Sequence, residues 1–332
     1  MKGKNMATKT FRAAIAAICV AAALPSYVVA GTATIGFAGY KGSETLTDFP
    51  ALIKLPDCAA GFAYADAAAN GADVYFTDSN GTVLAHDVDH WNASGSSYIW
   101  VKVPELTAET TITMHWGEAL PADLPAATTT WSGYVGVWHM NAANGSTSTA
   151  EPDATGNGLF AAPTRNTKSG VANRLAELRG MAAGKVGPAR QNQGVNGSFN
   201  CLKTGNYYGK ITDCSKMTIG GWFRATAASA WMRLFSAKNA NSNGYGFEAF
   251  TVNGSSTSFG ASGSSSHSST SNTTFPDVIQ NWVHAQIVYD GTTATYYVNG
   301  VAKNSFTVTA IKPNGNALYL AIGNDIDPDE AG

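Results

Sequence analysis

The sequence predicts an all-β protein, and three observations lead to that fold class. Charged residues make up only 13% of the 332-residue chain, whereas long helices are built mainly from Glu, Lys, Leu and Arg. Gly, Ser, Thr, Asn and Ala are plentiful instead. Short runs of β-branched and aromatic residues are separated by Gly and Asn, which is the composition of strands joined by tight turns.

The first thirty residues predict a cleavable secretory signal of the Sec type. A basic start is followed by the apolar run 13–24 and by small residues that end at Ala30, the three parts of such a signal. The basic residues are Lys2, Lys4, Lys9 and Arg12. A membrane span needs about 20 apolar residues, more than this run offers. Cys19 could suggest a lipoprotein, but the bulky Ile18 before it fits lipid attachment poorly. We therefore expect cleavage after Ala30, export to the cell surface or beyond it, and no membrane span in the mature chain.

The length and charge of the remaining chain limit its partners. About 300 residues suggest two domains. Without the four basic residues of the signal, 17 basic residues stand against 23 acidic ones, a net charge of −6. Nucleic-acid binding needs a dense basic face, so nucleic acid is not expected as a partner.

Two blocks of strand-like sequence are separated by residues 118–131, which hold two prolines and no apolar periodicity. This stretch is typical of an extended linker. The strands expected in the first block, residues 32–117, are 34–37, 51–55, 73–77, 83–91, 97–103 and 110–116. Residues 78–81 (Asp-Ser-Asn-Gly) supply a turn, with Gly at a position that favours positive φ. Six strands in about 85 residues predict a small β-sandwich.

The second block, residues 132–332, contains the clearest hairpins. Asp290-Gly291 and Asn299-Gly300 favour the turns whose twist matches paired strands. They predict a three-stranded meander over 283–289, 294–298 and 301–308. Further strands are expected at 217–224, 232–237, 245–252, 256–261 and 317–322. Residues 262–274 are expected as an exposed Ser/Thr-rich loop, and 172–179 as a short helix.

Three cysteines remain after the signal is removed, and an exported protein can keep a disulfide. Cys201 and Cys214 flank one loop, and a bridge closing it would contribute about 3 kcal/mol through loop entropy. The alternative is two unrelated small core residues. We expect the bridge, with Cys58 left as a buried thiol.

The first block resembles the family called domain of unknown function 2341. The matching segments lie at residues 46–55, 71–78, 91–92, 99–104 and 111–117, and the last one reads Thr-Ile-Thr-Met-His-Trp-Gly. The resemblance covers most of residues 32–117. It implies a β-rich module of bacterial and archaeal surface proteins, without an assigned activity.

The second block resembles the laminin G-like branch of the concanavalin A-like lectin/glucanase jelly rolls. The matching segments are 136–140, 153–158, 217–223, 281–284, 296–300 and 320–324. The resemblance implies a jelly-roll sandwich, with Trp138, Trp222 and Trp282 in the core. Such folds usually continue with another strand after the Ile-Gly-Asn turn, whereas this sequence stops at Gly332. Either the sequence is a fragment or the last strand is missing, and we expect the fragment because a missing inner strand would expose a sheet edge.

A search for catalytic residues finds little, so the protein is not expected to be an enzyme. Jelly-roll glucanases typically carry alternating carboxylates on one strand, spaced for glycoside hydrolysis, and no such cluster occurs here. No Ser motif has the strand-to-helix setting of a nucleophile elbow. The most metal-like string is residues 86–90 (His-Asp-Val-Asp-His). On a strand Asp87 and Asp89 would share one face and His86 and His90 the other, too few ligands per face for zinc. We expect solvent-facing polar sequence there.

Binding residues are better candidates than catalytic ones. Laminin G-like domains often hold one calcium ion at a loop rim, and the resemblance places Asp153, Asn324 and Asp325 there, although ordinary polar turns explain them too. Calcium is therefore the cofactor that the resemblance implies. Sugar recognition needs aromatic platforms, and the loop aromatics Tyr207, Tyr208 and Trp231 are candidates, although such residues are more often core than contact.

Three functions remain open from the sequence. The first is a non-catalytic binding or adhesion protein whose ligand is a glycan, another extracellular polymer or a protein. The second is an accessory region of a larger secreted glycoside hydrolase or peptidase. The third is a structural spacer without a ligand. Fold alone cannot decide among them, and the sequence does not indicate the oligomeric state.

Overall fold

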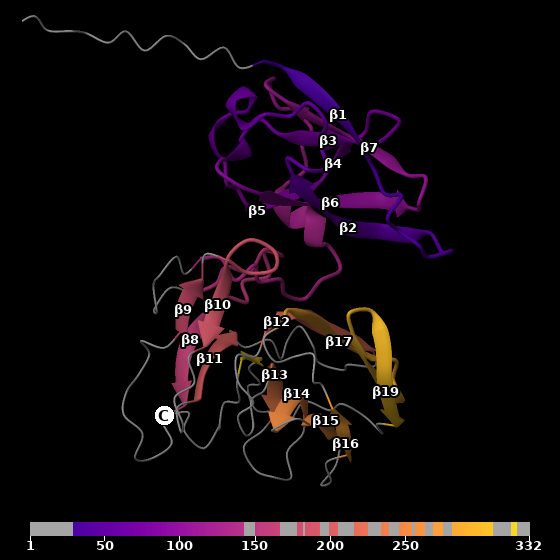
Figure 1. Cartoon of the computed structure of the whole chain (residues 1–332), viewed down its shortest axis with the longest axis vertical. Coiled ribbons are helices and arrows are strands. Elements are labelled where there is room, and N and C mark those ends of the chain that lie inside the picture. The colour runs from indigo at the N-terminus through magenta and orange to yellow at the C-terminus, as the bar shows by residue number, and fades with distance from the viewer. Residues whose placement is uncertain are drawn as a thin grey trace, which may run out of the picture.

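The computed structural model describes residues 29–142, 150–166, 178–181, 183–192, 199–204, 216–224, 234–238, 246–253, 256–262, 268–274, 281–307 and 320–323. The described part of the chain is all-β, as predicted, apart from three short 3-10 helices. The described residues form two separate hydrophobic cores, one built from the strands before residue 118 and one from the strands after residue 150. Figure 1 shows these two groups of strands. We call these parts the first domain (31–117), the junction segment (118–142) and the second domain (150–323).

The first domain is a sandwich of two antiparallel sheets. One sheet has the order β1-β7-β3-β4 and the other the order β2-β6-β5. The bounds are β1 Gly31–Gly36, β2 Leu46–Leu55, β3 Tyr75–Thr77, β4 Val83–Leu84, β5 His86–His90, β6 Ser97–Leu106 and β7 Thr111–Trp116. The short 3-10 helices η1 (Tyr64–Asp66) and η2 (Ala69–Gly71) lie between β2 and β3. The six strands predicted for this block are all present, and the structure adds a break that divides 83–91 into β4 and β5.

Alternation along the strands builds the core of the first domain. In β6, Ile99, Val101 and Val103 are buried and the residues between them are not, as a strand with one inward face requires. Ile53 of β2 and Met114 of β7 meet them in the same core. One cysteine departs from expectation. Cys58 is a free, exposed thiol, not a buried one, because it lies in the turn after β2 ends.

The second domain is a two-sheet jelly roll. Its larger sheet has the order β16-β15-β14-β13-β20-β11-β8, and its smaller sheet the order β12-β17-β18-β19. The strands are β8 Ala161–Asn166, β11 Phe199–Thr204, β12 Met217–Phe223, β13 Phe235–Lys238, β14 Gly246–Asn253, β15 Ser256–Ser262, β16 Ser268–Thr274, β17 Val283–Tyr289, β18 Thr293–Val298, β19 Val301–Thr307 and β20 Ala321–Ile322. A hairpin of β9 (Leu178–Met181) and β10 (Ala189–Asn192) stands beside these sheets.

The predicted meander is confirmed as β17–β18–β19, joined by the two expected turns. In β17 the residues Val283, Ala285, Ile287 and Tyr289 are buried and those between them are only partly buried. They pack against Leu202 and Phe235 of the larger sheet, so the core lies between the two sheets.

Two predictions for this block are wrong. Ser268–Thr274 forms β16 and pairs with β15, although a Ser/Thr-rich loop was expected. Thr supports strand structure well even without apolar neighbours. Leu178 and Arg179, expected at the end of a helix, open β9, and the rest of that helix lies outside the described residues.

Several other predictions also fall outside the described residues. They concern the signal up to residue 28, and the side chains of Tyr207, Tyr208, Cys214, Trp231, Asn324 and Asp325. Cys201 lies on β11 opposite Thr164, but without Cys214 its disulfide stays a prediction. No helix of the described residues is long and apolar enough to cross a membrane.

Candidate ligand-binding site

The junction segment packs against the first domain and does not run freely between the domains. Within the stretch expected as an extended linker, Ala127–Trp131 forms the 3-10 helix η3. Thr130 and Trp131 are buried, and the indole of Trp131 meets that of Trp100 edge to face, with ring centres 5.4 Å apart. The buried tryptophan thus packs η3 of the junction segment against the first domain.

The polar centre of this contact is His139. Its Nε2 lies 2.9 Å from Oδ2 of Asp87, and its Nδ1 lies 3.1 Å from Oδ2 of Asp89. Both ring nitrogens therefore face carboxylates, which favours the doubly protonated imidazolium. Burial alone would lower the pKa of His139, but hydrogen bonds to Asp87 and Asp89 raise it to about 9. The cation is held between two residues of β5 in the first domain.

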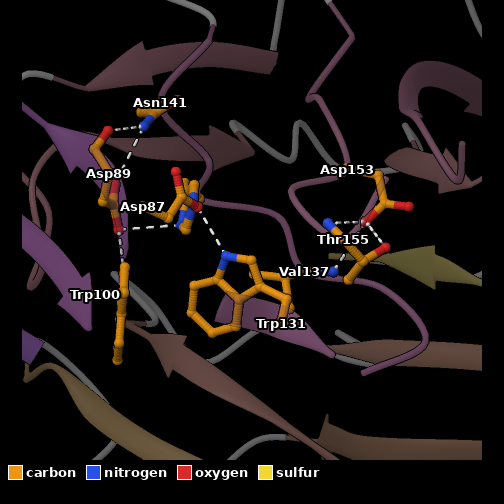
Figure 2. Close-up of polar contacts among 9 residues, drawn as sticks. Asp87, Asp89, Trp100, Trp131, Val137, Asn141, Asp153 and Thr155 are labelled. Atoms are coloured by element: carbon orange, nitrogen blue, oxygen red, sulfur yellow. Dashed lines mark hydrogen bonds and ion pairs between the residues drawn. The ribbon is translucent and has the colours of Figure 1, made fainter. Parts of the chain in front are cut away.

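Two indoles and an amide complete the cluster. The Nε1 of Trp131 donates to Asp87 at 2.7 Å, and the Nε1 of Trp100 donates to Asp89 at 2.9 Å. Asn141 donates to the Oδ1 of Asp89 at 3.1 Å and to the Asp89 carbonyl oxygen. Figure 2 shows the two indoles pointing at their carboxylates. The predicted shared face of Asp87 and Asp89 is confirmed, but the expected solvent exposure is wrong, because Asp89 is buried.

The contacts of this cluster join carboxylates, indoles, an imidazole and an amide from three segments of the chain. Among the described residues no hydroxyl or thiol bonds to His139. Among the same residues no group of three or more His, Cys, Asp and Glu side chains could hold a metal ion. The cluster binds the junction segment to β5 of the first domain.

Asp153 is the one described member of the predicted calcium set. It is 9% exposed, and its Oδ1 accepts hydrogen bonds from the amide of Val137 and from both the amide and hydroxyl of Thr155 (Figure 2). Its Oδ2 accepts the amide of Leu159 at 3.0 Å. Asp153 therefore organises its own loop, and its partners in the predicted set lie outside the described residues.

An open hollow of about 450 Å³ lies on the outer face of the smaller sheet. Its lining residues come from four segments and are Lys185, Trp222, Trp282, His284, Asn299 and Gly300. The volume is within the range of about 300–1,000 Å³ found for small-ligand sites. Aromatic rings beside amide and basic groups are the features that such a site requires.

Trp222 forms the exposed wall of the hollow, and it was expected in the core. In β12 the odd-numbered residues are partly buried and the even-numbered ones exposed, so Trp222 is directed outward and is 41% exposed. Its ring centre lies 5.4 Å from that of His284. Trp138, in contrast, packs on the second core as expected, and its Nε1 donates to the Leu159 carbonyl at 2.7 Å.

The floor of the hollow is held by the hairpin turn between β18 and β19. The Oδ1 of Asn299 accepts the His284 amide at 2.9 Å, and the Asn299 amide donates to the His284 carbonyl at 2.8 Å. Asn299 and Gly300 both have positive φ, as the predicted Asn-Gly turn requires. Burial lowers the pKa of His284, so its imidazole is neutral at neutral pH.

Two cations approach the tryptophans of the hollow. The Nζ of Lys185 lies 5.2 Å from the ring centre of Trp222, and the guanidinium of Arg224 lies 5.3 Å from that of Trp282. Both distances fall within the reach of a cation–π contact. A ligand that packs on either indole therefore meets a positive charge as well.

The loop that carries Lys185 also contacts the first domain. It joins β9 to β10, and its Gly187 has a φ of +59°. A Cβ on Gly187 would lie 3.0 Å from the Cβ of His90 on β5, so the two backbones approach closely. Strands β10 and β12 lie on the side of the second domain nearest the first (Figure 1). The hollow and the junction are thus connected through this loop.

Comparisons with known families agree with the two resemblances in order and kind. Residues 196–331 match the family described as the concanavalin A-like lectin/glucanases superfamily. Residues 70–151 match the domain of unknown function DUF2341. The chain therefore joins a DUF2341 region to a concanavalin A-like domain. The DUF2341 match includes the junction segment, with Trp131 and His139.

Comparisons with solved structures give distant similarities. The chain is similar to domain 4 of AbnA, a GH43 extracellular arabinanase from Geobacillus stearothermophilus in complex with arabinotriose, with 16% identity over 52% of this chain and 78% of that one, and a TM-score of 0.37. It is also similar to the botulinum neurotoxin serotype D binding domain, with 11% identity over 53% of this chain and 41% of that one, and a TM-score of 0.33. No curated protein matches the sequence.

Proposed function

We propose that this chain is a secreted, non-catalytic glycan-binding protein, and that its concanavalin A-like domain binds the glycan in the hollow on the β12–β17–β18–β19 sheet. The observation that carries the proposal is the exposed indole of Trp222 on a strand face beside His284 and Asn299. A tryptophan left 41% exposed on a rigid sheet offers a flat apolar surface for a sugar ring. Exposed aromatic anchors of this kind dominate recognition surfaces.

The polar groups of the hollow suit sugar hydroxyls. The Oδ1 of Asn299 is engaged by the His284 amide, so its Nδ2 hydrogens are the donors left for a ligand. Neutral His284 adds a ring nitrogen. Few polar groups beside an apolar wall are the usual make-up of a small-ligand site, and the export signal expected from the sequence would bring the site into contact with extracellular glycans.

Glycan-array and polysaccharide pull-down measurements on the whole chain test this proposal, each with calcium and with a chelator. We expect Trp222→Ala to lose at least about tenfold in affinity, the effect of a hot-spot residue. The matched control is Phe160→Ala, which removes an aromatic side chain that is 58% exposed and does not line the hollow. Equal binding by the wild type and by Trp222→Ala would move the site elsewhere. No binding by the folded wild type would favour the structural spacer.

A further inference from the structure

The charges around the hollow point to one class of ligand. Lys185 and Arg224 each lie over one of its tryptophans. Among the described residues, no carboxylate lines the hollow, and none pairs with either cation. Two cations close together in a chain with a net charge of −2 are a local feature, which makes them informative about what binds there.

From this arrangement we infer that the hollow selects a sugar unit that carries a carboxylate, such as a uronic acid within a polysaccharide. The inference rests on the proposed function and narrows it. The apolar face of the ring packs on Trp222, and the carboxylate accepts hydrogen bonds from Lys185 or Arg224. Charge-assisted bonds from these groups to a carboxylate are about twice as strong as neutral ones.

The number and placement of the cations indicate how much negative charge the bound part of the ligand carries. Binding of a dense polyanion requires a basic stripe that spans many charges. Among the described residues Lys185 and Arg224 supply two positive charges over the indoles, and the neutral His284 beside Trp222 does not add a third. They therefore match one carboxylated sugar unit at a time, and they do not match the phosphate backbone of a nucleic acid.

Their attachment to the fold makes the cations a built feature of the hollow. Arg224 directly follows β12, whose last residues pair with the start of β17. Lys185 lies in the β9–β10 loop, where the Gly184 amide donates to the Gly187 carbonyl at 2.7 Å. The next strand is anchored by an ion pair between Arg190 and Glu151, both with nearly fully buried side chains. The lysine is thus presented from a fixed loop.

The test compares uronic-acid polymers with the same polymers after chemical reduction of their carboxyl groups. Polygalacturonate, alginate and hyaluronan serve as probes in the presence of a chelator, with single-stranded DNA as a further probe. The wild type should bind one acidic polymer at least about fivefold more tightly than its reduced form, the effect of about 1 kcal/mol from exposed charges. Added salt should weaken the binding of the acidic form.

Charge-removing variants then assign the preference to these residues. Lys185→Met combined with Arg224→Gln should remove the preference for the acidic polymer and keep binding of the reduced one. The control Lys303→Met removes an exposed lysine of β19, on the same sheet but outside the hollow, and should change nothing.

Each remaining outcome has a defined meaning. Equal binding of acidic and reduced polymers overturns the charge inference and leaves the glycan proposal intact. No binding of any glycan overturns both. Binding of single-stranded DNA as tightly as the acidic polymer would show that the hollow binds polyanions in general. That result would overturn the selectivity for a sugar.

Discussion

The Nε2 of His139 lies 2.9 Å from Oδ2 of Asp87, across the contact between the junction segment and the first domain. The same imidazole reaches Asp89 through Nδ1, so one cation is shared by two carboxylates of β5. Their side chains are 17% and 4% exposed. Because water has little access, this pairing holds the junction segment on the first domain more strongly than an exposed ion pair would.

Replacing His139 should loosen the junction. In His139→Gln the two carboxylates remain largely buried without a cation, and breaking a buried ion pair in this way costs about 3 kcal/mol. Chemical unfolding followed by the fluorescence of Trp100 and Trp131 should show this loss, together with faster proteolysis in the junction segment. Lys54→Met, which breaks the exposed pair with Asp57, should leave the unfolding curve unchanged. Equal behaviour of the two variants would contradict the role of His139.

The junction should also give the protein a characteristic loss of stability in alkali. The pKa of His139 rises from 6.5 to about 9 in the folded protein. A raised pKa stabilises the fold fully below pH 6.5, and this contribution disappears as the pH rises through 9. At 1.36 kcal/mol per pKa unit the contribution is about 3 kcal/mol. Between pH 6 and 10, the midpoint temperature of thermal unfolding should fall more steeply for the wild type than for His139→Gln.

Asp87 makes the stability of the fold depend on pH in acid. Burial alone would raise the pKa of this carboxyl, but hydrogen bonds from His139 and Trp131 lower it below 3.8. A lowered pKa stabilises the fold above 3.8, and the contribution is lost as the pH falls through the folded value. An NMR titration of the Asp87 carboxyl should therefore show a midpoint below 3.8, and a midpoint above it would contradict the geometry at this site.

Two adjacent glycines of β12 should differ in their tolerance of alanine. A Cβ on Gly220 would lie 2.9 Å from the carbonyl oxygen of Ala285, whereas a Cβ on Gly221 would meet only the Phe235 ring at 3.8 Å. Gly220→Ala therefore forces β12 away from β17 and should cost about 1–3 kcal/mol, the usual effect of overpacking. Gly221→Ala is the matched control and should be nearly neutral by thermal unfolding. A larger loss of stability in Gly221→Ala than in Gly220→Ala would show that β12 lies differently on the sheet.

The buried pair of Arg190 and Glu151 should be required for the second domain. Their side chains are 5% and 0% exposed, and the Oε2 of Glu151 also accepts the Ala142 amide at 3.1 Å. Arg190→Met leaves Glu151 buried without its cation and should cost about 3 kcal/mol. Chemical unfolding should show the transition of the second domain at a lower denaturant concentration than in the wild type. The control Arg224→Gln should unfold at the same concentration as the wild type.

The first domain could be predicted well because its strands alternate cleanly. Ile99, Val101 and Val103 mark one face of β6 without interruption. In the second domain, the Asp-Gly and Asn-Gly turns predict the β17–β18–β19 meander equally well. Strand β16 gave no such signal, because Ser and Thr fit a loop and a strand alike.

The hollow could not be predicted, because two glycines in β12 obscure the alternation of inward and outward side chains along that strand. In Met217–Phe223, one glycine lies on each face, so the alternation that directs Trp222 outward is hard to see beside Ile219 and Phe223. The pairing of His139 with Asp87 is separated by 52 positions in the sequence, and no local pattern reports a contact over such a distance. Periodicity describes strands, whereas both sites arise from tertiary packing.

The contact of Gly187 with His90 has a consequence for how such proteins can diversify by recombination. A crossover within residues 118–130 would fall between the two groups of strands, although it would cut through the DUF2341 match. It would separate Asp87, Asp89 and His90 from His139 and Gly187, which contact them. Exchange of the concanavalin A-like domain with that of another protein should therefore succeed only when strand β5 is transferred together with its new neighbour.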